Sequence, residues 1–137
     1  MPDGPEFLSL GRGQRFLRWL RRRRFVVADG SMAPTLIPGD ALYVDPRAYR
    51  LRPPRPGDIV VFRDPVLPSR HLVKRIAFVP DGPAPTDGTV VLAGSVYLVG
   101  DSPAASRDSR EFGPVPLALL VGRVYECYRP IAHRRSW

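Results

Sequence analysis

The sequence contains one cysteine, two histidines and one lysine, and these scarcities narrow the chemistry that it can support. The single cysteine, Cys127, cannot form an intrachain disulfide, so stability does not depend on an oxidising compartment. Cys127 lies in GRVYECYR, whose alternation is typical of a strand, and a free cysteine there usually serves as a small half-buried residue.

Long apolar runs are also missing. No stretch approaches the ~20 apolar residues of a membrane-spanning helix, and the first residues show no pattern typical of a secretory signal. We therefore expect a protein without a transmembrane helix that is cytoplasmic or bound peripherally to a membrane.

Turn-forming residues are abundant, with 17 prolines and 12 glycines among 137 residues. They divide the chain into short segments, which disfavours a helical bundle and indicates one mainly β domain. Segments rich in valine, isoleucine, phenylalanine and tyrosine predict strands at residues 25–28, 41–45, 58–62, 71–79, 89–94, 96–100 and 120–128.

Positive charge is concentrated near the beginning of the chain. The net charge is +8, and most of it comes from arginines between Arg12 and Arg24. We divide the chain into a basic arm (1–24), a folded domain (25–130) and a basic tail (131–137). A short helix in the arm would gather its apolar residues on one side, and it could pack on the domain or lie on an anionic membrane surface.

One turn-rich stretch, GSMAPTLIPGD at residues 30–40, contains Ser31. Serine, proline, glycine and aspartate are common in turns, so the stretch is either an ordinary loop or a segment that presents Ser31 as a nucleophile. A nucleophilic serine needs a base. His133 belongs to a tail that we expect to be solvated, whereas His71 opens a predicted strand and could serve a Ser-His-Asp arrangement.

Lys74 is the stronger candidate for the base. It is the only lysine among 21 lysine and arginine residues, and strand alternation places it on one face with Leu72, Ile76 and Phe78. Burial among apolar side chains lowers the pKa of a lysine and leaves a neutral amine that can accept a proton, whereas arginine does not deprotonate in proteins. The alternative is that Lys74 extends its amine to solvent at a strand edge.

Three stretches, in this order along the chain, strengthen the catalytic interpretation. DGSMAPTLIPGD resembles the serine box of type I signal peptidases, in which S-M-x-P-T-L carries the nucleophile. RPGDIVVF followed by HLVKRIAFV looks like the strand pair of that family that bears the base lysine, and VYLVGDSPAASRDSREFGPVPLALLVGRV resembles its C-terminal box. The resemblance covers residues 26–124 and implies a compact β domain like those of signal peptidases and LexA, with a short basic N-terminal helix or arm.

The resemblance implies a serine endopeptidase with a Ser/Lys dyad, without a metal or cofactor. Ser31 would attack the scissile carbonyl, Lys74 would accept its proton, and Ser106 would hydrogen-bond Lys74 and orient it. The Ser31 backbone N–H would donate to the oxyanion. Some relatives add a serine hydroxyl two residues before the nucleophile, where this chain has Asp29, so we expect Asp29 to turn away or the oxyanion to rely on backbone donors.

Other residues that match the family would support the site. Asp108 and Arg110 would form an ion pair that holds the C-terminal box, with Arg75 as a third member. Met32 and Val73 would form shallow apolar pockets that select small substrate residues such as alanine.

The implied reaction removes an N-terminal leader or signal peptide from a precursor protein. As a minimal form of the family without a membrane span, the chain is similar to the maturation proteases of nickel-type superoxide dismutase. The expected partners are that precursor and an anionic membrane surface at Arg12–Arg24, with no nucleic acid. One alternative is a catalytically retired module of the same fold whose basic arm binds membranes or nucleic acid. Another is a self-cleaving repressor of the LexA type, but the 30 residues before Ser31 are too few for a DNA-binding domain.

Overall fold

The computed structural model describes residues 22–137, so the basic arm expected at residues 1–24 lies outside the described residues except for its end. The fold is mainly β, as predicted. Its strands are β1 (Arg23–Val26), β2 (Ala41–Asp45), β3 (Ile59–Arg63), β4 (His71–Phe78), β5 (Ser95–Val99), β6 (Val115–Pro116), β7 (Leu120–Arg129) and β8 (Arg135–Ser136). Short helices α3 (Ala48–Leu51) and α4 (Ser109–Phe112) and the 3₁₀ turns η1 (Pro103–Ala105), η2 (Leu117–Leu119) and η3 (Ile131–His133) occupy the connections. No helix in residues 22–137 has the length and apolar character needed to cross a bilayer.

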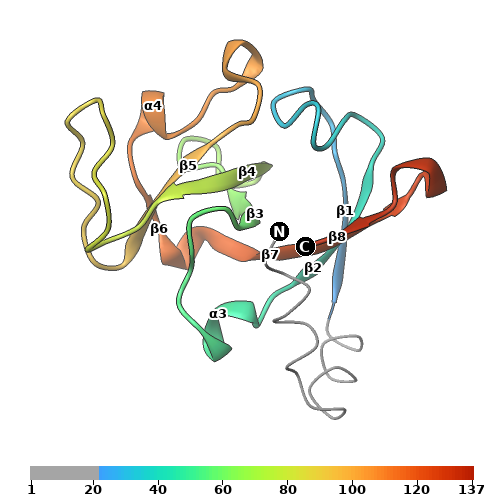
Figure 1. The fold of residues 1–137 in the computed structure, drawn as a ribbon, viewed down its shortest axis with the longest axis horizontal. Coiled ribbons are helices and arrows are strands. Elements are labelled where there is room, and N and C mark those ends of the chain that lie inside the picture. Colours follow the sequence, from blue (N-terminus) through green and yellow to red (C-terminus); the bar gives the residue numbers. More distant parts are fainter. Residues whose placement is uncertain (1–21) are drawn as a thin grey trace.

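The strands form an antiparallel sheet in the order β1-β2-β7-β3-β4-β5-β6, and β8 pairs with β7. The long strand β7 pairs with β2, β3 and β8, so it links the two halves of the molecule. Figure 1 shows β7 crossing between a half that contains β1, β2 and β8 and a half that contains β4, β5 and β6.

Strand β3 has apolar side chains on both faces because each face covers a separate core. Ile59 and Val61 enter one cluster with residues of β2, β7 and the 27–40 loop, whereas Val60 and Phe62 enter a second cluster with residues of β4, β5 and β6. Side chains alternate along a strand, so a continuous apolar run is needed where both faces are covered. The loop that carries Ser31 and the strand that carries Lys74 therefore each rest on a packed core.

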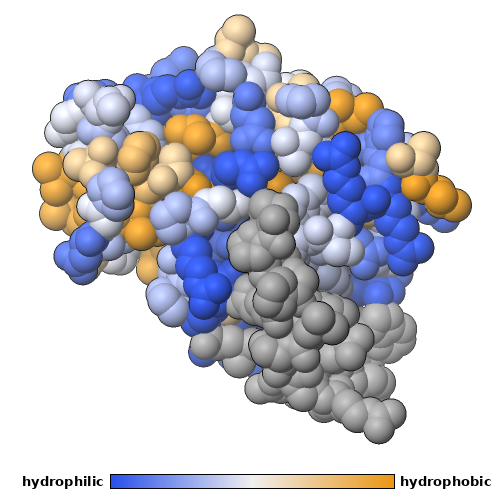
Figure 2. All heavy atoms as spheres, in the orientation of Figure 1, coloured by the Kyte–Doolittle hydropathy of each residue, from blue (hydrophilic) through white to orange (hydrophobic). Residues whose placement is uncertain are grey.

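The prediction of a strand at residues 89–94 is wrong. No strand in the described part of the chain pairs with this segment, and Val90 and Leu92 are 70% and 68% exposed. The segment belongs to a loop, residues 79–93, that lines a cavity of about 420 Å³. The valines and leucine favour an extended backbone, but a strand also needs a neighbour to accept its hydrogen bonds. Figure 2 shows apolar atoms on the side where this loop lies in Figure 1.

Both ends of the predicted domain also extend further than expected. Strand β1 begins at Arg23, and the preceding Arg22 places its guanidinium 4.0 Å from the centroid of the Tyr43 ring. The segment 131–137, expected to be a basic tail, contains β8 and ends in Trp137, which is buried in the first core cluster. His133, expected to be solvated, lies with Nδ1 3.0 Å from Oδ1 of Asp40.

Candidate active site

The loop between β1 and β2 carries Ser31. A hydrogen bond between its two ends and two buried side chains hold this loop in place. The N–H of Val27 donates to the carbonyl of Asp40 at 2.8 Å and closes the loop. Met32 and Leu36 are buried in the first core cluster, and the N–H of Leu36 donates to the carbonyl of Met32 at 3.0 Å. This anchoring holds the residue next to Met32 in a defined position.

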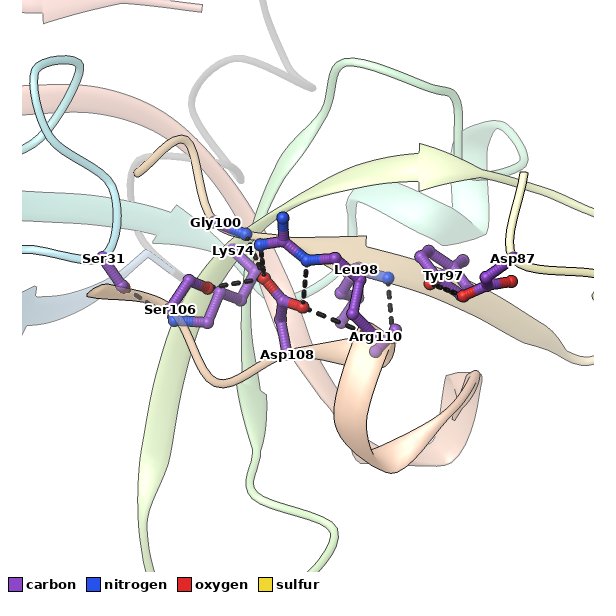
Figure 3. A network of polar contacts seen from close by, with 10 residues as sticks. Ser31, Lys74, Asp87, Tyr97, Leu98, Gly100, Ser106, Asp108 and Arg110 are labelled. Carbon is purple, nitrogen blue, oxygen red and sulfur yellow. Dashed lines mark hydrogen bonds and ion pairs between the residues drawn. The ribbon is translucent and has the colours of Figure 1, made fainter. Parts of the chain in front are cut away.

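Ser31 and Lys74 meet in the interior, although 43 residues separate them along the chain. The Lys74 Nζ lies 2.6 Å from the Ser31 Oγ, and the two residues are 2% and 3% exposed. Leu72 and Ile76 on the same face of β4 are also buried, as strand alternation predicts. The alternative that Lys74 reaches solvent is therefore wrong. Figure 3 shows the two side chains pointing toward one another from the loop and from β4.

The surroundings of Lys74 favour its neutral form. Burial is the largest influence and lowers the pKa of Lys74 below its ordinary value of 10.5. The carboxylates of Asp29 and Asp108 act in the opposite direction, while Arg107 and Arg110 lower the pKa further. The net direction is downward, so the amine is more easily deprotonated than that of an exposed lysine.

Asp108 is the central hydrogen-bond acceptor of the segment that faces Ser31 and Lys74. Its buried carboxylate accepts hydrogen bonds from the Ser106 hydroxyl at 2.6 Å, the Gly100 N–H at 2.9 Å and Nε of Arg110 at 2.9 Å. Burial alone would raise the pKa of Asp108, but the hydrogen bonds from Arg110, Ser106 and Gly100 outweigh it and lower the pKa to about 2. The Ser106 hydroxyl, expected to bind Lys74, donates to Asp108 instead (Figure 3).

Gly100 brings this segment against the loop of residues 27–40 that carries Ser31, the candidate nucleophile; we refer to it as the nucleophile loop. The N–H of Ser102 donates to the Ser31 carbonyl at 2.9 Å. A Cβ at Gly100 would lie 2.2 Å from the Ser106 Oγ and 2.6 Å from the Ser31 carbonyl oxygen, closer than atoms pack. The absence of a side chain at Gly100 is therefore what allows the two segments to approach.

The expectation that Arg75 joins the Asp108–Arg110 pair is wrong. Arg75 binds Asp101 with two hydrogen bonds, Nε to Oδ1 at 2.9 Å and Nη2 to Oδ2 at 2.8 Å. The hydroxyl of Thr35 donates to the same carboxylate at 2.6 Å. Sequence reasoning missed Asp101 and Thr35 as members of the site, although both lie inside the quoted family motifs. Together they tie β4, the Gly100 segment and the nucleophile loop to one another.

Of the two alternatives given for Asp29, the one in which it turns away is wrong, whereas reliance of an oxyanion on backbone donors stays a prediction. The Ser31 backbone N–H, the expected oxyanion donor, donates to Oδ1 of Asp29 at 3.0 Å. Loss of some hydration would raise the pKa of Asp29, but the hydrogen bonds from Ser31 and the charges of Lys74 and Arg70 outweigh it and lower the pKa. Asp29 thus accepts from the backbone donor that the family resemblance assigns to the oxyanion.

The remaining candidates lie outside the immediate contact. His71 lies three positions before Lys74 on β4, so its side chain is on the opposite face of the strand. It is exposed there, and its ring centroid lies 5.4 Å from that of Phe25. Met32 is 1% exposed and supports the loop from within the core instead of lining an open pocket. Val73 is half-buried against the same cluster. Residues 22–137 contain no group of three or more histidine, cysteine, aspartate or glutamate residues placed to hold a metal ion.

Comparison with known proteins gives a consistent family match. The family described as "Signal peptidase, peptidase S26" matches residues 15–82 and 80–129. The chain is 43% identical over 106 residues to the mitochondrial ATP-independent inner membrane protease subunit 1b of Arabidopsis thaliana, covering 69% of this chain and 62% of the relative. It is 34% identical over 108 residues to the mitochondrial inner membrane protease subunit 1 of Xenopus tropicalis, covering 72% and 65%. A probable signal peptidase I-1 of Synechocystis is 27% identical over 131 residues, covering 72% and 66%. The matched region is thus about two thirds or less of each relative.

Proposed function

The chain belongs to the signal peptidase family S26, and we propose that it is a serine endopeptidase with Ser31 as nucleophile and Lys74 as general base. The observation that carries the proposal is the 2.6 Å separation of the Ser31 Oγ and the Lys74 Nζ in an interior that lowers the pKa of the lysine. A serine hydroxyl is a weak nucleophile until an adjacent base removes its proton. A desolvated lysine amine at hydrogen-bond distance is suited to that step.

The reaction can be written with this pair alone. The neutral Lys74 amine accepts the Ser31 proton as Oγ attacks the scissile carbonyl carbon, which forms a tetrahedral intermediate and an ammonium. The ammonium then donates its proton to the leaving amine as the peptide bond breaks, leaving an acyl group on Ser31. Water, activated in turn by Lys74, hydrolyses the ester and restores the dyad. Ser106 and Asp108 keep the facing segment in place.

The substrate class that we propose is a precursor protein with an N-terminal leader, with small residues before the cleaved bond. Strand β4 pairs with β3 at residues 71–75, whereas its pairing with β5 begins only at Arg75. In the described part of the chain, the second edge of β4 at residues 71–73 thus has no partner strand. An extended leader could add to this edge by main-chain hydrogen bonds and reach the dyad beside Lys74.

A membrane is the proposed place of action. Two of the relatives are named as inner membrane proteases, and the arginines of Arg12–Arg24 add positive charge that favours an anionic lipid surface. The contact between Ser31 and Lys74 favours the peptidase over a retired binding module, because a module without activity has no need to keep it.

Cleavage of a panel of precursors with alanine-x-alanine leaders, measured across pH, tests the proposal. The wild type should cleave, with a rate that rises with pH as Lys74 loses its proton. Ser31→Ala and Lys74→Arg should both lose cleavage, since arginine does not deprotonate. Asp81→Asn, in the exposed 79–93 loop away from this edge, is the control and should retain activity. Full activity of Lys74→Arg would contradict the assignment of the base, and a panel that no form cleaves would favour the binding module.

A further inference from the structure

The Asp29 carboxylate accepts a hydrogen bond from the Ser31 backbone N–H, a donor that the proposed reaction requires. As Oγ of Ser31 attacks, the carbonyl oxygen becomes negative and must be stabilised by donors already in place. The backbone N–H of Ser31 belongs to the nucleophile itself and could donate to that oxygen if it were free. In the structure this N–H is engaged by Oδ1 of Asp29 at 3.0 Å.

The Asp29 carboxylate can leave this position without disturbing the core. Asp29 is exposed, and its acceptor bond spans only two residues, so a side-chain rotation releases the N–H. At the neighbouring Gly30 nothing lies within 4 Å of the position of a Cβ, so there is open space beside the turn. Asp108 differs, because it is buried and receives hydrogen bonds from several groups.

The charge of Asp29 also acts on the dyad. The charged groups that influence Lys74 are the carboxylates of Asp29 and Asp108 and the guanidinium groups of Arg107 and Arg110. Asp29 itself is influenced by Lys74 and by Arg70. Proton transfer from Ser31 creates an ammonium on Lys74, and a nearby carboxylate stabilises that ammonium.

We propose that Asp29 is a positioning residue that covers the oxyanion donor of the resting enzyme, is displaced from it by the scissile carbonyl of the substrate, and supports the ammonium that forms on Lys74. The inference rests on the proposed peptidase function. It assigns Asp29 two opposed effects: competition with the oxyanion for the Ser31 N–H, which slows the reaction, and stabilisation of the positive charge, which sets the pH at which the dyad works.

Two substitutions separate these effects. Asp29→Asn keeps a side-chain oxygen that can accept from the Ser31 N–H, but it removes the charge. Asp29→Ala removes both the charge and the acceptor. Both variants should move the rise of kcat/KM with pH to lower pH, because the Lys74 ammonium loses a stabilising neighbour. At the high-pH plateau, where both variants lack the charge, Asp29→Ala should exceed Asp29→Asn several-fold, within a limit of roughly 10²–10³ that one oxyanion donor is worth, because only asparagine can still accept from the Ser31 N–H.

The experiment combines kinetics with a readout that needs no substrate. Lys74 is the only lysine in the chain, so protein labelled with ¹³C at the lysine Cε gives one side-chain resonance whose titration reports Lys74 alone. That titration should move to lower pH in Asp29→Asn and stay unchanged in Asp81→Asn, an exposed acidic residue of the 79–93 loop. A precursor cleaved by wild type is the substrate for the kinetic arm.

The outcomes separate this inference from the proposed function. Unchanged titration in Asp29→Asn, or a plateau in Asp29→Ala no higher than that in Asp29→Asn, overturns the inference while cleavage by wild type upholds the peptidase. A lysine titration that shifts in Asp29→Asn although no form cleaves any precursor supports the coupling of Asp29 to Lys74 and rejects the peptidase.

Discussion

Gly100→Ala should disable the proposed peptidase without a change to Ser31 or Lys74. The new Cβ would lie 2.2 Å from the Ser106 Oγ and 2.6 Å from the Ser31 carbonyl oxygen. Ordinary contact begins near 3.4 Å, so the nucleophile loop and the Gly100 segment must separate by about 1 Å. A displacement of this size at a reacting group can cost about 100-fold in rate, and overpacking of this kind costs about 1–3 kcal/mol in the free energy of unfolding.

The assay is kcat for precursor cleavage together with urea unfolding, with Gly82→Ala as the matched control. Gly82 tolerates a Cβ, whose nearest contacts would be 3.5 and 3.6 Å from Val79, so its variant should match wild type in both measurements. We expect Gly100→Ala to lose about 100-fold in kcat while it still unfolds cooperatively. Wild-type kcat in Gly100→Ala would refute the conclusion that close approach of these segments positions Ser31.

Three further predictions follow from the ionisable groups. The pKa of Asp108, lowered to about 2 from 3.8, implies that roughly 2 kcal/mol of stability is present above pH 4 and is lost as the pH falls toward 2. Urea unfolding between pH 2 and 7 should show this loss in wild type. An equal dependence of the unfolding free energy on pH in Asp108→Asn would contradict it. Asp101→Asn should lower the free energy of unfolding by about 1–3 kcal/mol, because Arg75 loses its charged partner, whereas Asp81→Asn should not. Lys74→Met should abolish cleavage yet raise the melting temperature at neutral pH, since burial disfavours the ammonium in the folded state only. Wild type should gain stability as the pH rises toward 10.5, because the buried Lys74 loses its proton. A similar gain in Lys74→Met would show that another group causes it.

Strand alternation was enough to place Lys74 on an apolar face, because the period of two is a property of the local backbone, but it left open whether the amine reached solvent. The same local reasoning predicted most of the strands. It failed at residues 89–94, where Val90 and Leu92 favour an extended chain but no described strand lies alongside to pair with them. Pairing depends on the whole sheet, which a local pattern does not contain.

The partner of Arg75 could not be chosen from the sequence alone. Asp101 and Asp108 lie in the same segment. As long as the register of β4 against β5 is unknown, the arginine side chain could reach either carboxylate. The structure pairs Arg75 with Val99 across β4 and β5, which places the arginine beside the residues that follow Val99 and therefore beside Asp101. The contact of Asp29 with the Ser31 N–H is different, since aspartate often hydrogen-bonds the backbone two residues on, and this tendency was available from the sequence.

Titration of the single ¹³C-labelled lysine resonance decides whether a buried lysine can serve Ser31 as a neutral base. Lys74 should titrate below 10.5, and its midpoint should coincide with the rise of kcat/KM with pH. A lysine that titrates at or above 10.5 would remain an ammonium at the working pH, and it would contradict the assignment of Lys74 as the base.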